Sequence, residues 1–265
     1  MGRSRPLRDL GLAITLLTAL PIPVRWPDAR ERPDVASWFP VVGLGFGVLL
    51  LGVYLIAVRF FYGISGVTVA LILALLAVAT RLLHWDALAD TADAWFVAPG
   101  RRLDVMADSH VGAFGATAIA LVVLLQWSSL VELGGSRVTA ATVVLVPVFG
   151  RLAASFSAWL GQPARQGGLG ASVIRRPTVL GALASAAAVG AAIALAAVSG
   201  ASTVALGVIA LAGLALALVV PHLIALRFGG VTGDTMGASV VVVETGVLLV
   251  ALVTVAVLRL VGVSA

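Results

Sequence analysis

The chain has 265 residues, of which 61% are hydrophobic and only 11% are charged, whereas about a quarter of the residues in a soluble domain are charged. This composition excludes an ordinary water-soluble globular protein. The absence of cysteine excludes disulfides, thiolate metal sites and cysteine nucleophiles. All 17 basic residues are arginine, and in so apolar a chain we assign them to loops that orient the protein and meet anionic lipid, not to nucleic-acid binding.

The N-terminal segment combines three arginines with an apolar stretch over 10–20 that Pro21 and Pro23 end. A signal peptide also begins in this way, but the prolines stand where a cleavage site needs small residues. The stretch is shorter than the roughly 20 residues that a spanning helix needs. We therefore expect a half-inserted or surface helix here.

Seven apolar segments follow, each near the length of a spanning helix. They are expected to be helices because a backbone in lipid must satisfy its own hydrogen bonds, and the alternation of a membrane barrel is absent. The sequence therefore predicts an all-α, polytopic integral membrane helix bundle that forms one domain over 1–265. The expected spans are 38–58, 64–83, 112–131, 138–160, 178–199, 201–225 and 240–263.

The connections between these spans alternate between long, charged segments and short, nearly uncharged ones. Thirteen of the 17 arginines lie in the long set or at its border, and three lie in the short set or at the C-terminus. The positive-inside rule then places the long set in the cytoplasm and the protein in the cell membrane. The long connections are 1–37, 84–111, 161–177 and 226–239.

The connection 84–111 begins with a group of carboxylates. Asp86, Asp90 and Asp93 follow one another at i, i+4 and i+7, so they share one face of a helix. Like charges at this spacing destabilise a helix. Because the group directly follows an apolar span, it lies at the membrane boundary, where charge tends to be functional.

A hard divalent cation is the simplest way to neutralise this group. Mg²⁺ prefers oxygen ligands and is commonly held by one or two carboxylates together with waters and substrate phosphates. The alternative is a solvated helix end whose carboxylates pair with arginines. The arginines available for such pairs are Arg81, Arg101 and Arg102.

A second acidic pair and two histidines lie in the same connection. Asp104 and Asp108 again share a helix face, which indicates either further site carboxylates or a surface helix with a cap at its end. His84 is a candidate base or ligand. His110 is expected to form a hydrogen bond at a helix end.

Two glycine-bearing segments, 163–170 and 229–237, belong to the same set of long connections. Glycines let backbone N–H groups approach phosphate oxygens, and Arg165 suits a bidentate contact with phosphate. Asp234 adds another carboxylate. A flexible connection is the alternative for each segment taken alone. The glycines predicted to bind phosphate are Gly168, Gly170, Gly230 and Gly233.

This collection suits transfer between phosphate-bearing substrates. Mg²⁺ would bridge phosphate oxygens, and arginine and backbone amides would hold the rest of the phosphate. One aspartate would take a proton from an attacking hydroxyl. Arg151 and Glu244 lie inside predicted spans and are expected to face the bundle interior, near the site.

Four ordered stretches resemble those of the adenosylcobinamide-GDP ribazoletransferase family, also called cobalamin-5'-phosphate synthase. Because they extend over most of the chain and keep the family's order, the likeness is specific. The N-terminal ITLLTALPIP is similar to the family's start. The four stretches are LLHWDALADTADAW, RRLDVMADSHVGAFG, ARQGGLG and GGVTGDTMGA.

The resemblance implies that a ribose hydroxyl of α-ribazole or its 5'-phosphate attacks the cobinamide-linked phosphorus of adenosylcobinamide-GDP, and that GMP leaves. It also implies Mg²⁺. Arg165 matches the arginine of the family's glycine loop, and the attacking hydroxyl would lose its proton to Asp86, Asp90 or His84, a choice that stays open. The family's acids fall on Asp86, Asp90, Asp93, Asp108 and Asp234.

The chain departs from the family pattern at three positions. Ala87 and Ala94 replace glycines, and Gly167 stands where the family often has an acid. These changes bear on individual roles more than on the assignment.

Two alternative functions are weaker. A CDP-alcohol-type membrane phosphotransferase would use the same metal chemistry, but its Asp-Gly-x-Ala-Arg pattern is absent. A transporter would need polar groups near the bilayer midplane on several helices. Only Arg151, His222 and Glu244 are candidates for such depth.

Overall fold

The computed structural model describes residues 6–25, 33–60, 65–165 and 167–262, and in these residues the regular structure is helical. The predicted all-α fold is confirmed. Two short 3₁₀ turns, η1 (Ala36–Trp38) and η2 (Pro99–Arg101), supplement the α-helices. The α-helices are α1 (Pro6–Leu17), α2 (Phe39–Phe60), α3 (Gly66–Ala79), α4 (Leu83–Trp95), α5 (Arg102–Met106), α6 (Ala113–Leu133), α7 (Arg137–Leu160), α8 (Gly168–Val173), α9 (Val179–Val198), α10 (Thr203–Phe228) and α11 (Gly233–Leu260).

Six helices are long and apolar enough to cross a membrane, namely α2 with η1, α6, α7, α9, α10 and α11. The molecule is therefore a multi-pass membrane protein. Helix α7 is central, since nearly all of its side chains are buried. Helices α6 and α10 expose many apolar side chains, as expected for surfaces that face lipid.

The second predicted span, 64–83, is the one that does not form a single straight helix. Helix α3 has 14 residues, and an 87° break separates it from α4. Arg81 and Leu82 adopt left-handed backbone angles at this break, with φ of 54° and 59°. This conformation costs roughly 1–2 kcal/mol for a residue with a side chain. The break turns α4 away from the direction of the span.

The left-handed conformation of Leu82 gives a stability prediction. Leu82→Ile is expected to lower the free energy of unfolding by about 1 kcal/mol more than Leu82→Asn, because a β-branched residue fits this conformation poorly and asparagine fits it well. Thermal melting of both variants in the same detergent measures the difference. Equal melting temperatures would contradict a strained break.

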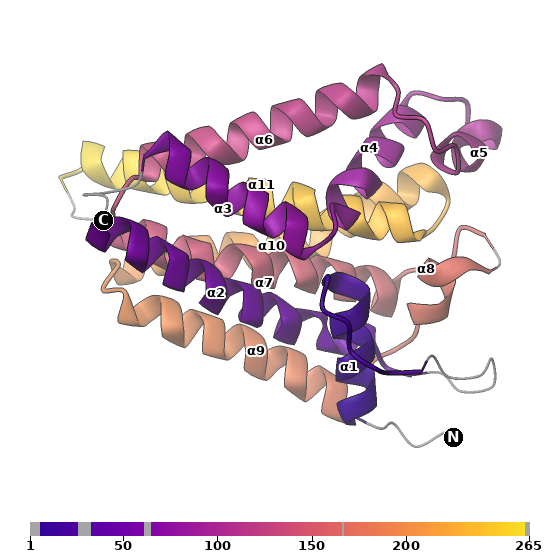
Figure 1. Cartoon of the computed structure of the whole chain (residues 1–265), viewed down its shortest axis with the longest axis horizontal. Helices are drawn as coiled ribbons and strands as arrows, with labels where there is room; N and C mark the ends of the chain where they lie inside the picture. Colours follow the sequence, from indigo (N-terminus) through magenta and orange to yellow (C-terminus); the bar gives the residue numbers. More distant parts are fainter. Residues whose placement is uncertain (1–5, 26–32, 61–64, 166, 263–265) are drawn as a thin grey trace.

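The long connections gather at one end of the bundle. Figure 1 shows α4, α5 and α8 at the right end, and the last turns of α6 and α11 at the opposite end. We call the first end the loop face, defined by 84–111, 161–177 and the start of α11. The alternation of long and short connections therefore has a structural counterpart.

The segment 226–239 was predicted to be a loop between two spans. It is mostly helical, so this prediction is wrong. Helix α10 continues to Phe228 and α11 begins at Gly233. A capping box starts α11, because the Thr235 amide donates to the Thr232 hydroxyl over 3.1 Å and the Thr232 amide donates to the Thr235 hydroxyl over 2.8 Å. Asp234 then lies in the first turn, where a negative charge is favourable.

Helix α1 ends at Leu17, before the prolines, and packs against the bundle with Leu12 and Ala13 fully buried. The Asp34 amide donates to the Asp9 carboxylate over 3.1 Å. Asp34 itself accepts hydrogen bonds from Ser37 and from Thr178, which caps α9. These bonds attach α1 to the loop end of α2 and α9. Its depth in the membrane stays a prediction.

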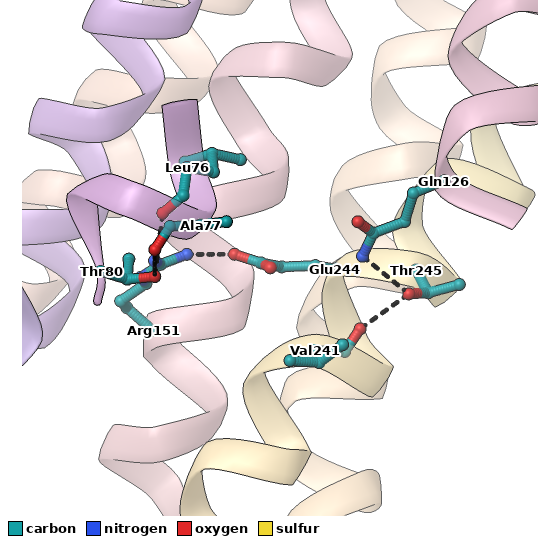
Figure 2. Close-up of polar contacts among 8 residues, drawn as sticks. All are labelled: Leu76, Ala77, Thr80, Gln126, Arg151, Val241, Glu244 and Thr245. Carbon is teal, nitrogen blue, oxygen red and sulfur yellow. Dashed lines mark hydrogen bonds and ion pairs between the residues drawn. The ribbon is translucent and has the colours of Figure 1, made fainter. Parts of the chain in front are cut away.

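A buried ion pair joins the two most enclosed spans. Arg151 of α7 pairs with Glu244 of α11, and the two residues are only 1% and 7% exposed. Figure 2 shows the two side chains extended toward each other between the helices. The Arg151 guanidinium also lies 4.9 Å from the centre of the Phe46 ring. A Cβ atom at Gly150 would lie 2.7 Å from Glu244, so that glycine makes room for the carboxylate.

Further polar side chains accompany this pair. Gln126 donates to the Thr245 hydroxyl over 3.0 Å, and that hydroxyl donates to the Val241 carbonyl over 2.8 Å, as Figure 2 shows. Because polar groups in an apolar interior must be paired, these bonds fix α6 against α11. Arg151 and Glu244 face the interior as predicted, but they do not line the cavity described below.

Candidate active site

A cavity of about 220 Å³ opens at the loop face. Helix α4, the segment before and within α8, and the first turns of α11 surround it, so regions far apart in the sequence meet here. Its apolar wall comes from Leu17, Phe39 and Ala154. The predicted site residues that line it are His84, Asp86, Arg165, Gly168, Gly170, Gly233 and Asp234.

Helix α4 packs its apolar side chains against neighbouring helices and carries Asp86 and Asp90 on another face. Ala87, Leu88 and Ala94 are buried against neighbouring helices, while Asp86 lines the cavity and Asp90 lies one turn further along. This division follows from the spacing of apolar and acidic residues at helical period. The helical face predicted for the aspartates is therefore present.

The neighbouring carboxylates affect the pKa of Asp90. Burial, the largest cause, and the negative charges of Asp86, Asp234 and Asp93 together raise its pKa to about 6. The carboxylates of α4 and α11 thus lie close enough to repel one another. A cation among them would favour their ionised forms.

Asp93 has a structural role in the fold. Its carboxylate accepts hydrogen bonds from the amides of Gly112 and Gly115, over 2.7 and 2.9 Å, and so caps the start of α6. A Cβ atom at either glycine would come within 2.5 Å of an Asp93 oxygen. This contact explains the acid without a metal, and its role as a ligand stays a prediction.

Asp108 does not line the cavity. Its side chain is 58% exposed, and the His110 ring lies 2.6 Å from its carboxylate. The hydrogen bonds from His110 lower the pKa of Asp108. The hydrogen bond expected of His110 is present, but the structure does not bring Asp108 to the residues of the cavity. Asp104 is exposed on α5.

The two glycine segments pair through their backbones. The Val231 amide donates to the Gln162 carbonyl over 2.8 Å, and the Ala164 amide donates to the Val231 carbonyl over 3.0 Å. Gly230 has a φ of 149°, and a Cβ atom there would lie 2.7 Å from the Ala164 backbone. At Gly170 a Cβ atom would lie 2.5 Å from the amide of the α11 start. Both glycines permit close packing of the two segments.

Gly168 and Gly233 have a different setting. Both line the cavity, and a Cβ atom at either would meet nothing within 4 Å. Gly233 is the first residue of α11, where backbone N–H groups lack partners inside the helix. The start of a helix favours anions. Of the four predicted glycines, Gly168 and Gly233 are thus best placed for phosphate, Gly170 borders the cavity, and Gly230 does not line it.

Gly230→Ala and Gly233→Ala form a matched pair for testing these two roles. Gly230→Ala is expected to lower the melting temperature, because the new methyl group meets the Ala164 backbone. Gly233→Ala is expected to leave the melting temperature unchanged and to raise KM, because its methyl group projects into open space at the cavity. Melting curves and substrate titrations separate the roles. The opposite pattern would contradict them.

Arg165 is the cation of the cavity. It is exposed, and it lies near enough to Asp234 to interact with that carboxylate electrostatically. Among the residues that the structure describes, it forms no ion pair within 4.0 Å. Its guanidinium donors are therefore free to meet a phosphate.

His84 stands between this cavity and a small interior one of about 20 Å³ bordered by Arg151 and Glu244. It is 5% exposed, and its Nε2 atom has no hydrogen-bond partner in the described part of the chain. Burial lowers the pKa of its imidazole well below the usual value, and the Arg151 charge adds to this effect. His84 is therefore neutral at pH 7.

The carboxylates at the cavity suit a Mg²⁺ ion that is held jointly with substrate phosphate. Within the described ranges, no three His, Asp or Glu side chains form a group that could hold a metal ion by themselves. Asp86 and Asp234 line the cavity, and Asp90 shares their electrostatic field. One or two carboxylates with substrate phosphate oxygens are a usual Mg²⁺ environment. The residues present suit that arrangement better than a five-carboxylate site.

The three departures from the family pattern are accommodated locally. A Cβ atom at Gly237 would lie 2.5 Å from the Ala87 methyl group, so this methyl fills the contact between α4 and α11. Ala94 is fully buried and packs near Met106. Gly167 has a φ of 86° and borders the cavity, where a glycine is favoured.

Sequence reasoning missed the apolar wall of the cavity. Leu16 and Leu17 of α1 and Phe39 of α2 contribute to it, together with Val173. Apolar residues of this kind look the same in a membrane-facing helix and in a substrate cavity. The only signal was the likeness of the N-terminal stretch that contains the two leucines.

Comparisons with known proteins point to one enzyme family. A family model described as cobalamin-5-phosphate synthase matches residues 9–252. The chain is 38% identical to an adenosylcobinamide-GDP ribazoletransferase of Alkalilimnicola ehrlichii, over 92% of the chain and 94% of the relative. It is 36% identical to one of Mesorhizobium japonicum, over 92% and 93% of the two chains. No solved structure matches it.

Proposed function

The chain belongs to the cobalamin-5-phosphate synthase family and is an adenosylcobinamide-GDP ribazoletransferase, and we propose that its reaction takes place in the cavity at the loop face. A ribose hydroxyl of α-ribazole or its 5'-phosphate attacks the cobinamide-linked phosphorus. The bond from this phosphorus to the oxygen of GMP breaks, and GMP leaves. The product is adenosylcobalamin or its 5'-phosphate.

The observation that carries this proposal is the meeting of an acidic helix, an arginine and a helix start around one cavity. Asp86 and Asp234 would hold Mg²⁺, with Asp90 nearby. When bound, the ion would neutralise charge on the diphosphate of the donor. Gly233 at the start of α11 and Arg165 would bind the remaining phosphate oxygens.

The proton of the attacking hydroxyl has three candidate acceptors. Asp86 lines the cavity, Asp90 lies one turn along the same helix face, and His84 presents a buried neutral imidazole. A general base must come within hydrogen-bond reach of the hydroxyl. Asp86 is the aspartate of this helix that lines the cavity, so we propose it first, with Asp90 and His84 as the alternatives.

We propose that the protein lies in the cell membrane with its loop face on the cytoplasmic side. The support is the arginine distribution, since 13 of the 17 arginines belong to the long connections or their border. A tag inserted in 161–177 and probed from either side of the membrane tests the orientation. A periplasmic tag would contradict it.

A Mg²⁺ titration tests the proposed metal chemistry. Purified protein in lipid is freed of metal with a chelator and mixed with adenosylcobinamide-GDP and either α-ribazole or its 5'-phosphate. GMP release is expected to fall to background without metal and to return on addition of Mg²⁺. Full activity in the chelator would contradict the metal role without contradicting the transfer, and the faster acceptor identifies the preferred substrate.

A further inference from the structure

A second cavity, of about 500 Å³, lies away from the active site between α4, α6, α10 and α11. We call it the lateral groove. Phe114, Leu121 and Leu223 border it and are each 55% exposed, so it opens on the surface where α6 and α10 face lipid. Its deeper walls include Leu88, Ile224 and Ala238.

The lateral groove opens near the loop-face end of the bundle. Phe114 belongs to the first turn of α6, and Leu223 to the last turns of α10. Trp95 and Phe96, at the end of α4, form the rim of the groove on that side. Aromatic side chains are typical of the boundary between acyl chains and headgroups.

Two arginines lie next to the Trp95 side of this rim, just outside the residues that line the groove. Arg227 follows Leu223 by four residues, so it lies on the same side of α10 and one turn nearer the loop face. Its guanidinium lies 5.8 Å from the centre of the Trp95 ring and donates to the Trp95 carbonyl. Arg102 donates to the Val97 carbonyl over 3.0 Å and to the Arg227 carbonyl over 2.5 Å.

Neither guanidinium has a partner of opposite charge among the described residues. In the part of the chain that the structure describes, Arg102 and Arg227 form no ion pair. Burial lowers the pKa of Arg102, and the nearby charge of Arg227 lowers it further, yet an arginine stays protonated in proteins. A guanidinium has five donors, and the carbonyl contacts use only part of them. The pair thus favours an anion.

Thr91 supplies an independent polar feature inside the groove. This residue lines the groove and is 3% exposed, and its hydroxyl oxygen is buried without a hydrogen-bond partner among the described residues. A buried hydroxyl without a partner is unfavourable. An acceptor such as the ester carbonyl of a lipid would satisfy it.

We propose that the lateral groove binds one anionic phospholipid, with an acyl chain along its apolar walls and its phosphate on Arg102 and Arg227. The apolar opening toward lipid and the unpaired positive rim select this occupant. The back of α4 forms one wall of the groove, while the opposite face of α4 carries Asp86 and Asp90. A bound lipid would therefore hold the acidic helix in place. This site does not depend on the reaction proposed above.

Lipid retention tests the proposal without any enzyme assay. Delipidated protein in detergent is titrated with phosphatidylglycerol or with phosphatidylcholine of the same acyl chains, and bound lipid is counted by native mass spectrometry. Phosphatidylglycerol is expected to bind about tenfold more tightly, because no choline cation offsets the charge of its phosphate beside the two guanidinium groups. Arg102→Gln and Arg227→Gln are expected to remove this preference. Arg176→Gln, an exposed arginine elsewhere on the loop face, is the matched control.

Ala118→Phe provides a second variant, because it fills the groove without changing the arginines that hold the end of α4. It is expected to reduce phosphatidylglycerol retention severalfold while the protein stays folded by circular dichroism. Equal binding of the two lipids to the wild type would overturn the proposal. So would an effect of Arg176→Gln as large as that of Arg227→Gln, or undiminished retention in Ala118→Phe.

Discussion

Asp86→Asn is expected to lower kcat/KM for GMP release by about a hundredfold to a thousandfold, the loss that follows when a metal-held phosphate transition state loses a ligand or its base. Asp86 is the acid of α4 that lines the cavity. The substitution keeps the size of the side chain, so the melting temperature is expected to stay within the error of measurement. Initial rates of GMP release at saturating Mg²⁺ give the comparison.

Two other aspartates serve as matched controls for this prediction. Asp104→Asn, at an exposed position on α5, is expected to change neither activity nor melting. Asp93→Asn is expected to lower the melting temperature, because the carboxylate holds two amides at the start of α6. If Asp86→Asn retained at least half of the wild-type rate, the cavity would lose its role as the reaction site.

Glu244→Gln is expected to lower the free energy of unfolding by about 3–5 kcal/mol, because it leaves the buried Arg151 charge without its partner. Glu132→Gln, at an exposed position near the end of α6, is the matched control and is expected to have no effect. Stability is followed by thermal and denaturant unfolding in one detergent.

A double replacement separates charge from packing at this pair. Arg151→Met combined with Glu244→Leu removes both charges and keeps apolar volume, so most of the lost stability is expected to return. Because Arg151 also lies near His84, activity need not recover fully. A double variant as unstable as Glu244→Gln would show that the charge pair is not what holds α7 against α11.

The positions of the spanning helices could be predicted because apolar length is nearly sufficient to specify a span. The break after α3 could not be predicted. It occurs at Arg81 and Leu82, and no glycine or proline marks these left-handed residues in the sequence. Tertiary contacts at the end of α3, such as the hydrogen bond from the Ala19 amide to the Ala79 carbonyl over 2.7 Å, hold a conformation that local preference disfavours.

The start of α11 also could not be predicted from the sequence. Gly233 and Asp234 look like loop residues, and the capping box uses Thr232 with Thr235, whereas the usual sequence signature has Glu or Gln at the second position. The continuous apolar run begins only near 240. The prediction therefore placed the helix start two turns too late and read Asp234 as a loop residue.

The chemistry of the candidate site could be predicted from the sequence, but which residues belong to the site was harder to predict. Helical spacing correctly placed Asp86, Asp90 and Asp93 on one face, but a long-range contact with the amides of α6 explains Asp93. No spacing rule reveals that partner, 19 residues away in the sequence. Gly230 shows the same limit, because its close contact is with Ala164 in another segment.

The transfer reaction itself gives the most direct test of the central claim. Wild-type protein in lipid vesicles is incubated with adenosylcobinamide-GDP, α-ribazole and Mg²⁺, and all products are measured by mass spectrometry. GMP and adenosylcobalamin are expected to appear in equal amounts, and both are expected to be lost in Asp86→Asn. GMP without a corrinoid product that contains ribazole, or neither product from correctly folded protein, would contradict the assignment.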